Sequence, residues 1–196
     1  MKGVEQIKAW MESVPFLTKE DLDLFEPFLS VTTFAEKQLL LSEGEICREI
    51  CFVTSGLFRI YYLSDGKEIN TGFFFENEFV VDYESFINQK PSRFYIEALE
   101  DSVVIPLPHD LLMHAYNTSK NRERFGRMKA EEVARMTAER VESFLFMDGK
   151  ARSLWLVKER PNIFERVSLY HIASCLGMER ESLSRIRKAI VTRKGR

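Results

Sequence analysis

Polar residues near the end of the chain are spaced so that a single helix would present them together: Arg180, Glu181, Ser184, Arg185 and Lys188. At about 100° per residue, the last four share one side of the helix, and Arg180 flanks them at its N-terminal end. An Arg side chain pairs with guanine through two hydrogen bonds, and a Glu accepts from the amino group of cytosine. Ser and Lys suit phosphate oxygens, which position a protein on a duplex without reading its sequence. These residue types in this order predict contact with double-stranded DNA.

The residues behind this face predict a helix-turn-helix. Apolar residues on the other side of the helix, and on the helix before it, are spaced to form the small core that two crossed helices share: Ile172, Leu176, Met178, Leu183, Ile186 and Ile190. Ala173 is small where the two helices touch, and Gly177 supplies the left-handed backbone of the turn between them. A second interpretation leaves Glu181 and Arg185 as an i,i+4 surface ion pair, worth about 0.3–0.5 kcal/mol, with no role in DNA binding.

The distribution of charge favours the DNA interpretation. The net charge of −2 would argue against a partner as acidic as DNA, but the charges are unevenly spread. From Lys150 to the end the chain has 12 Lys and Arg against 4 Asp and Glu, whereas the first 149 residues have 16 against 26. A basic C-terminal quarter on an acidic body indicates a polyanion-binding module joined to something else.

The rest of the chain must position this module. The pattern of apolar and turn-forming residues changes along the sequence. Helices are predicted over residues 4–13 and 18–29, the second opening on Thr18 with Asp21 three residues later. Residues 31–107 then carry about eight short strands separated by turn signals about 8–12 residues apart, which is typical of an antiparallel sandwich or barrel. Asp65-Gly66 is the clearest hairpin turn.

A long helix is predicted over residues 121–147. An apolar stripe runs along it: Phe125, Met128, Val133, Met136, Val141 and Phe144. Such a stripe suits either a dimer seam or packing within one chain, and the spacing alone leaves both open. Asp148-Gly149 is the expected hinge after the helix. The fold class is therefore α+β, with an effector domain over 1–120, a dimerisation helix over 121–147 and a helix-turn-helix domain over 148–196.

With these elements in place, the chain resembles the cAMP receptor protein family of bacterial regulators, the Crp/Fnr type. The segment Arg180-Glu181-Ser182-Leu183-Ser184-Arg185-Ile186 is close to the family's R-E-T-V-x-R-hydrophobic motif, in which both Arg and the Glu read base edges. Gly44-Glu45 and Phe52-Val53-Thr54-Ser55-Gly56 resemble two signatures of the family's β-roll. The resemblance implies a homodimer that reads a two-fold-symmetric operator, with RNA polymerase as a further candidate partner.

The resemblance also implies a place for a cyclic nucleotide. In the family's phosphate-binding cassette a Glu takes the ribose hydroxyl and an Arg pairs with the cyclic phosphate. Asp82 falls at the Glu position, and Arg93 at the Arg position after one extra residue in the loop. Val81 replaces the family's Gly, and Phe94-Tyr95 replace the small pair that lets phosphate approach the backbone.

These departures leave the ligand open between cAMP or cGMP, a different small ligand, and no ligand. The aromatic pair is expected to crowd a phosphate, which weighs against cAMP and cGMP. Thr137 falls near the family's base-contacting position on the long helix. The alternative for Arg93 is an ion pair with Asp82 or Glu84 and no ligand.

Several functions are not supported. The three Cys do not suffice for a disulfide framework or a four-cysteine iron–sulfur centre, and the three His carry no metal-ligand spacing. No nucleophile or phosphate-loop motif occurs, so an enzyme is not expected. With 45% hydrophobic and 30% charged residues, no secretory leader and no apolar run of about 20 residues, the expectation is a cytoplasmic globular protein with no membrane partner.

Overall fold

The computed structural model describes residues 2–194, with side chains up to residue 189. Contacts along the chain divide it into two units. The first contains the residues up to Leu63 together with Thr71–Ala130, and the second contains Ser64–Asn70 together with the chain from Glu131 onwards. Within residues 2–194, no helix has the length and apolar character that crossing a membrane requires.

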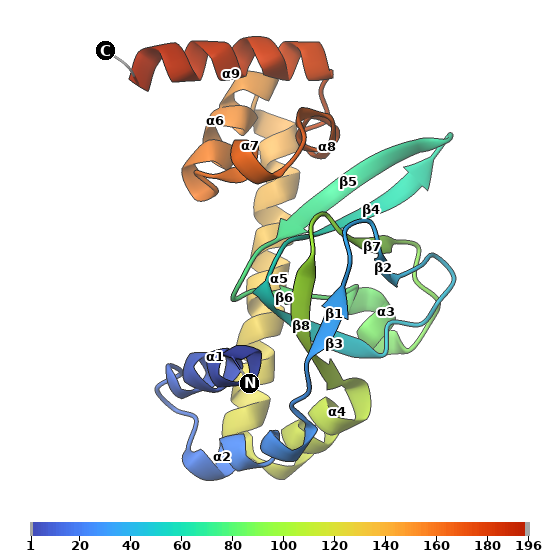
Figure 1. Ribbon diagram of the computed structural model, residues 1–196, viewed down its shortest axis with the longest axis vertical. Coiled ribbons are helices and arrows are strands. Elements are labelled where there is room, and N and C mark those ends of the chain that lie inside the picture. Colours follow the sequence, from blue (N-terminus) through green and yellow to red (C-terminus); the bar gives the residue numbers. More distant parts are fainter. Residues whose placement is uncertain (1, 195–196) are drawn as a thin grey trace. The chain divides into compact units, whose positions relative to one another are not determined.

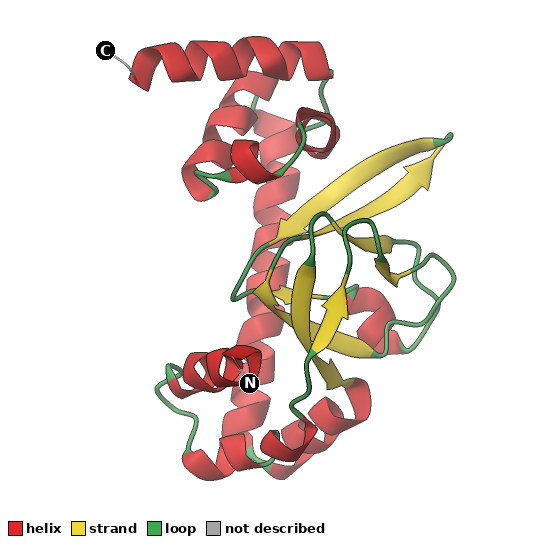
Figure 2. Ribbon diagram, in the orientation of Figure 1, coloured by secondary structure: helices red, strands yellow, loops and turns green. Residues whose placement is uncertain are grey.

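The strands confirm the predicted antiparallel β-roll (Figures 1 and 2). Their bounds are β1 Thr32–Phe34, β2 Leu39–Leu41, β3 Glu49–Ser55, β4 Phe58–Ser64, β5 Lys67–Phe74, β6 Phe79–Val80, β7 Tyr95–Ala98 and β8 Ser102–Pro108. One sheet has the order β1-β8-β3-β6 and the other β2-β7-β4-β5. In the first sheet Cys51 of β3 lies opposite Val80 of β6 and Pro106 of β8, and in the second Ile60 of β4 lies opposite Ile96 of β7.

Helices flank the sheets and form the C-terminal part of the chain, which completes the predicted α+β class. Their bounds are α1 Lys2–Glu12, α2 Lys19–Asp23, the 3-10 helix η1 Glu26–Phe28, α3 Tyr83–Asn88, α4 His109–Thr118, α5 Lys120–Phe146, α6 Gly149–Glu159, α7 Ile163–Arg166, α8 Leu169–Cys175 and α9 Arg180–Lys194. The helix expected over 18–29 is two short pieces, because Pro27 has no backbone N–H to donate. Thr18 and Asp21 form the expected capping box.

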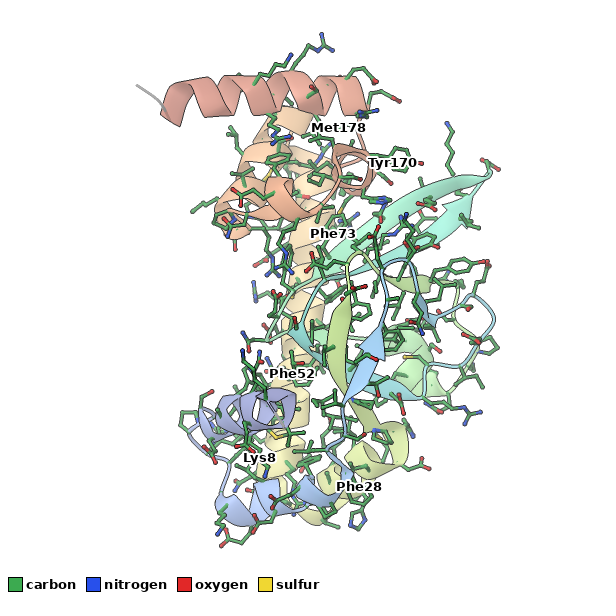
Figure 3. The ribbon with its side chains drawn as sticks, viewed as in Figure 1. Lys8, Phe28, Phe52, Phe73, Tyr170 and Met178 are labelled. Atoms are coloured by element: carbon green, nitrogen blue, oxygen red, sulfur yellow. The ribbon has the colours of Figure 1, made fainter. Side chains whose placement is uncertain are left out.

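Aromatic side chains fill the core of the first unit. The ring of Trp10 in α1 lies 5.4 Å from that of Phe52, 5.0 Å from that of Phe79 and 5.8 Å from that of Phe125 in α5. Phe52, which Figure 3 shows beside α1, is fully buried. Trp10 therefore joins the N-terminal helix, the β3–β6 sheet and the start of α5 into one apolar cluster.

A buried carboxylate joins α2 to the junction of α4 and α5. Asp21 is 4% exposed and accepts hydrogen bonds from Ser119 (2.5 Å), Asn121 (2.9 Å) and Nε of Arg122 (3.2 Å). Burial alone would raise the pKa of the Asp21 carboxyl, but the hydrogen bonds from Ser119, Asn121, Thr18 and Arg122 together lower it far below its ordinary value. The folded state therefore holds this carboxylate in its charged form.

We predict that this junction makes stability fall in acid. Because the pKa of Asp21 is lower in the folded chain than in the unfolded chain, its contribution is present above about pH 4 and is lost as the pH falls below that. Asp21→Asn should lower the free energy of unfolding at pH 7 by about 1–3 kcal/mol and flatten the dependence on pH below 5. Urea unfolding between pH 3 and pH 7 measures both. Asp23→Asn, an exposed carboxylate two residues on, is the control and should change neither.

Candidate functional site

The C-terminal helices form the predicted helix-turn-helix. α8 begins after Ser168, whose side chain accepts a hydrogen bond from the backbone N–H of His171 (3.3 Å). Gly177 lies in the turn with φ of +62°, the left-handed region that favours glycine. α9 starts three residues later. The small core between the helices includes Ile172, Ala173 and Leu183, all at most 2% exposed.

The end of α5 supports the turn. A Cβ at position 177 would lie 2.8 Å from Cε1 of Phe144, so a larger residue there would also require the Phe144 ring to shift. The guanidinium groups of Arg140 and Arg152 lie 5.1 Å and 4.7 Å from the ring centre of Phe144. Arg152 also donates through Nε to the carbonyl of Leu176 (3.1 Å). The turn is thereby fixed on α5 and α6.

The face of α9 that sequence analysis singled out is accessible. Arg180, Glu181, Arg185 and Lys188 are exposed, and Ser184 is half-buried. All but Lys188 border one shallow hollow of about 510 Å³. Arg185 donates through Nη2 to the hydroxyl of Ser182 (3.3 Å).

The opposite side of α9 faces the protein. Leu183 is fully buried and Ile186 is half-buried. The guanidinium of Arg187 lies 5.4 Å from the ring centre of Phe164 in α7. The side chain of Ile190, which was expected on this side, lies outside the described residues. α9 thus has one buried side and one polar side, as the spacing of its residues requires.

The tip of the β4–β5 hairpin, residues 64–70, belongs to the same unit as these helices. The Ser174 hydroxyl donates to the carbonyl of Glu68 (2.7 Å) and accepts from the backbone N–H of Asn70 (3.0 Å). Arg140 donates through Nη2 to the carbonyls of Cys175 (3.1 Å) and Asn70 (3.4 Å). Sequence analysis did not foresee this bridge, which anchors α8 through the hairpin backbone.

The cassette of the β-roll is built around Asp82. Its side chain caps α3 by accepting from the backbone N–H of Ser85 (3.4 Å), and it is 7% exposed. The hydroxyl of Ser92 donates to the other carboxylate oxygen of Asp82 at 2.6 Å, and Ser92 is 3% exposed. The backbone N–H of Phe94 donates to the same Ser92 hydroxyl (2.9 Å). These bonds close the loop between α3 and β7 with Asp82 inside.

Arg93 is not brought to Asp82. Its side chain is 77% exposed and lies 3.5 Å from the carboxylate of Glu84, which is 71% exposed. Such an exposed pair contributes little to stability. The residue that faces Asp82 is Ser92, one position before Arg93. The two side chains to which the resemblance gives the ribose and phosphate contacts are therefore separated.

The aromatic pair after the loop is engaged with β4. Phe94 meets the ring of Tyr62 edge to face at 5.9 Å, and Tyr95 stacks on Tyr61 at 5.1 Å. The Tyr95 hydroxyl is 3.2 Å from a carboxylate oxygen of Glu43. Thr137 is exposed on α5, where its hydroxyl donates to the carbonyl of Val133 (2.8 Å), and it belongs to the second unit.

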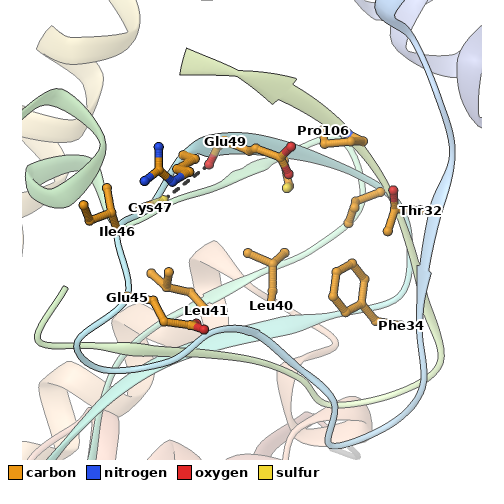
Figure 4. A pocket seen from close by; sticks show the side chains of 12 residues that line it. Thr32, Phe34, Leu40, Leu41, Glu45, Ile46, Cys47, Glu49 and Pro106 are labelled. Atoms are coloured by element: carbon orange, nitrogen blue, oxygen red, sulfur yellow. Dashed lines mark hydrogen bonds between the residues drawn. The ribbon is translucent and has the colours of Figure 1, made fainter. Parts of the chain in front are cut away.

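The β-roll contains a cavity of about 510 Å³ that no pattern in the sequence indicated (Figure 4). Its walls come from β1, β3 and β8 of one sheet, from β2 of the other, and from the loop over residues 45–48. No residue of the cassette between Asp82 and Tyr95 lines it. The signal in the sequence was weak, since it consists only of small residues at inward positions of strands.

Comparison with known proteins agrees with this architecture. Residues 31–119 match the family model of the cyclic nucleotide-binding domain. No curated protein matches the chain. Among solved structures, FixK2 from Bradyrhizobium japonicum is similar with a TM-score of 0.73 and 19% identity, over 85% of this chain and 86% of that one.

Two further solved structures are similar over most of their length. The regulator CLP of Xanthomonas campestris gives a TM-score of 0.65 at 18% identity, over 90% of this chain and 93% of that chain. A protein of Eubacterium rectale, described as a transcriptional regulator of the Crp/Fnr family, gives 0.68 at 18% identity, over 90% and 85%. The chain thus contains a cyclic nucleotide-binding domain and has the fold of Crp/Fnr regulators.

We predict that cAMP and cGMP bind no more tightly than about 1 mM, the equivalent of about 4 kcal/mol. The reason is that Ser92 rather than a guanidinium faces Asp82, while Arg93 points to solvent. Isothermal titration calorimetry with each nucleotide measures this. Arg93→Ala should leave the result unchanged. Micromolar binding that disappears in this variant would contradict our description of the cassette.

Proposed function

We propose that this chain is a homodimeric, sequence-specific DNA-binding transcription regulator of Crp/Fnr type. The observation that carries the proposal is the start of α9, where Arg180, Glu181 and Arg185 are exposed together on a helix whose other side is buried. A recognition helix uses this part to contact base edges in the major groove. Arg and Glu supply complementary groups for a guanine–cytosine pair, and Ser184 and Lys188 suit phosphate.

The charge of the surrounding chain supports DNA over a protein partner. The chain from Lys150 onwards carries three times as many basic as acidic residues. Protein–protein interfaces are depleted in Lys, whereas a basic face attracts the phosphate backbone. CLP is described as a c-di-GMP-responsive global regulator that links cell–cell signalling to virulence gene expression. That description concerns CLP, and the similarity of fold supports the proposal of a regulator.

The dimer is inferred from α5. Phe125 packs on Trp10, but the apolar residues after it are exposed: Met128, Val133, Met136, Val141 and Phe144. Burying such surface is worth about 25 cal/mol per Å². A second copy of α5 would cover this stripe, and two copies of α9 would then read a symmetric site. The alternative of packing entirely within one chain would leave Met136 and Val141 in water, at 46% and 53% exposed.

The functional division that we propose is 1–120 for the effector domain, 121–147 for dimerisation and 148–196 for DNA binding. We place the protein in the cytoplasm, with RNA polymerase as a candidate partner and no catalytic step. A small ligand in the β-roll controls DNA binding, or the protein acts without one. A ligand can shift the equilibrium between two states only by its differential affinity for them.

The family match over residues 31–119 favours a second candidate, a nucleotide sensor or scaffold without specific DNA binding. The separation of Asp82 from Arg93 weighs against its sensing part. The second candidate also has no specific DNA target, and the exposed polar face of α9 weighs against that part of it. The DNA experiment below separates the two candidates.

We predict that Arg185→Ala costs about 1–3 kcal/mol at the cognate site and relaxes base preference at one position in each half-site. Lys188→Ala should weaken binding to all sequences alike and lower the dependence of log affinity on log salt by about one unit. Half-sites should lie about 10 bp apart, or a multiple of this, centre to centre. Selection from a random DNA pool, followed by footprinting with both variants, measures these effects. The proposal fails if no symmetric motif is enriched or if the two variants behave alike on selected and random DNA.

We predict a dimer of 23.0 kDa chains at micromolar concentration, held through α5. The double substitution Met136→Glu and Val141→Glu should convert the dimer to a monomer, because each chain would bury two carboxylates without partners in the interface. Light scattering measures the mass. Val31→Glu changes a side chain of similar exposure (44%) in the first unit and should leave the dimer intact. A dimer that survives the double substitution would place the interface elsewhere.

A further inference from the structure

The cavity inside the β-roll has its own chemistry. Figure 4 shows Phe34, Leu40 and Leu41 on one side of it, with Cys47 and Glu49 across from them. Its volume of about 510 Å³ lies in the range, about 300–1,000 Å³, of sites that bind small molecules. Its walls are drawn from both sheets, so it penetrates the space where two packed sheets normally interdigitate.

Polarity changes with depth in the cavity. The deepest side chains are apolar or thiols, and all are at most 4% exposed: Leu41, Cys47, Cys51 and Val104. Burial raises the pKa of both thiols, so they are uncharged at neutral pH. Arg48 and Glu49 lie at the exposed rim. A molecule that enters meets half-buried apolar side chains, chiefly Phe34, Leu40 and Ile46, and an exposed rim with charges of both signs.

Small side chains at inward positions create the space. The inner positions of β3 and β8 carry Cys51 and Val104, which are smaller than the Phe side chains that fill other parts of the core. Protein interiors are close-packed, and unfilled apolar volume forfeits dispersion contacts. An apolar molecule in this volume would restore those contacts, whereas a charged one would lose its hydration against an apolar floor.

The wall of the cavity is held in place before any ligand binds. The backbone N–H of Gly44 donates to the carbonyl of Ser92, and the N–H of Ser92 donates to the carbonyl of Glu45, both at 2.8 Å. The Glu45 carboxylate accepts from the N–H of Ser42 (2.7 Å). A site that is already ordered avoids much of the entropy cost of binding.

We propose that this cavity binds a small, uncharged, mainly apolar molecule whose polar end lies at the rim beside Arg48 and Glu49. The site is separate from the cyclic-nucleotide cassette, since Asp82, Ser92 and Arg93 take no part in its lining. Binding there does not depend on the proposed DNA-binding function, and its test uses no DNA. Failure of one therefore leaves the other standing.

The test uses the full-length protein and 6-propionyl-2-dimethylaminonaphthalene, an uncharged fluorophore whose emission shifts to the blue in apolar surroundings. We expect saturable binding of one probe per chain at micromolar concentration. Leu40→Trp, which adds bulk in the cavity, should weaken binding at least tenfold. Leu39→Trp is the matched control, because Leu39 is the neighbouring residue, is 40% exposed and does not line the cavity. Equal affinity in the two variants, or no saturable binding, would overturn the proposal.

A second measurement uses the wild-type chain and does not depend on how well a variant folds. The rate at which N-ethylmaleimide alkylates each cysteine is followed by mass spectrometry with and without the fluorophore. We expect at least fivefold slower alkylation of Cys47 and Cys51, which line the cavity, and no change at Cys175 in the second unit. Unchanged rates at all three cysteines, or equal protection of all three, would place the probe outside the cavity.

Discussion

The left-handed backbone at Gly177 is the constraint on which the direction of the recognition helix depends. The φ of +62° favours glycine, and a Cβ there would also require the Phe144 ring to shift. Arg140 and Arg152 lie against the same ring and donate to carbonyls at the end of α8. The carbonyl groups at the C-terminal end of α8 thus accept hydrogen bonds from the same Arg side chains that pack on the Phe144 ring. The exposed face of α9 takes its orientation from this cluster.

In the first unit, the hydrogen bonds of the cassette hold Ser92 inside, against Asp82, whereas Arg93 lies at the surface beside Glu84. A buried carboxylate is well satisfied by a hydroxyl and a helix N-terminus. The guanidinium that the resemblance assigns to an anionic ligand lies at the surface beside the carboxylate of Glu84.

Features whose interacting residues lie close together in the sequence could be predicted, whereas features formed by distant residues could not. The helix-turn-helix lies within some twenty residues, so the spacing of its apolar side chains and Gly177 sufficed to place it. Turn residues likewise indicated the strands. The bridge from Ser174 to Glu68 spans 106 positions, and the cavity depends on the pairing of β3 with β8, so neither leaves a local pattern. The ion pair of Arg93 with Glu84 is one of the alternatives that the sequence left open, because residue type alone does not fix which partner a loop side chain meets.

The two ends of the β-roll therefore offer a ligand different sources of free energy. At the cassette, Asp82 is already satisfied and the aromatic residues Phe94 and Tyr95 are engaged with β4, so an anion gains little there. Between the sheets, the half-buried side chains of Phe34, Leu40 and Ile46 offer apolar surface that a ligand can cover. Binding then draws on burial, at about 25 cal/mol per Å², rather than on neutralising a phosphate. Only the part of that energy which differs between two states of the protein is able to control DNA binding. A sensor of this design would respond to the size and shape of its ligand more than to its charge.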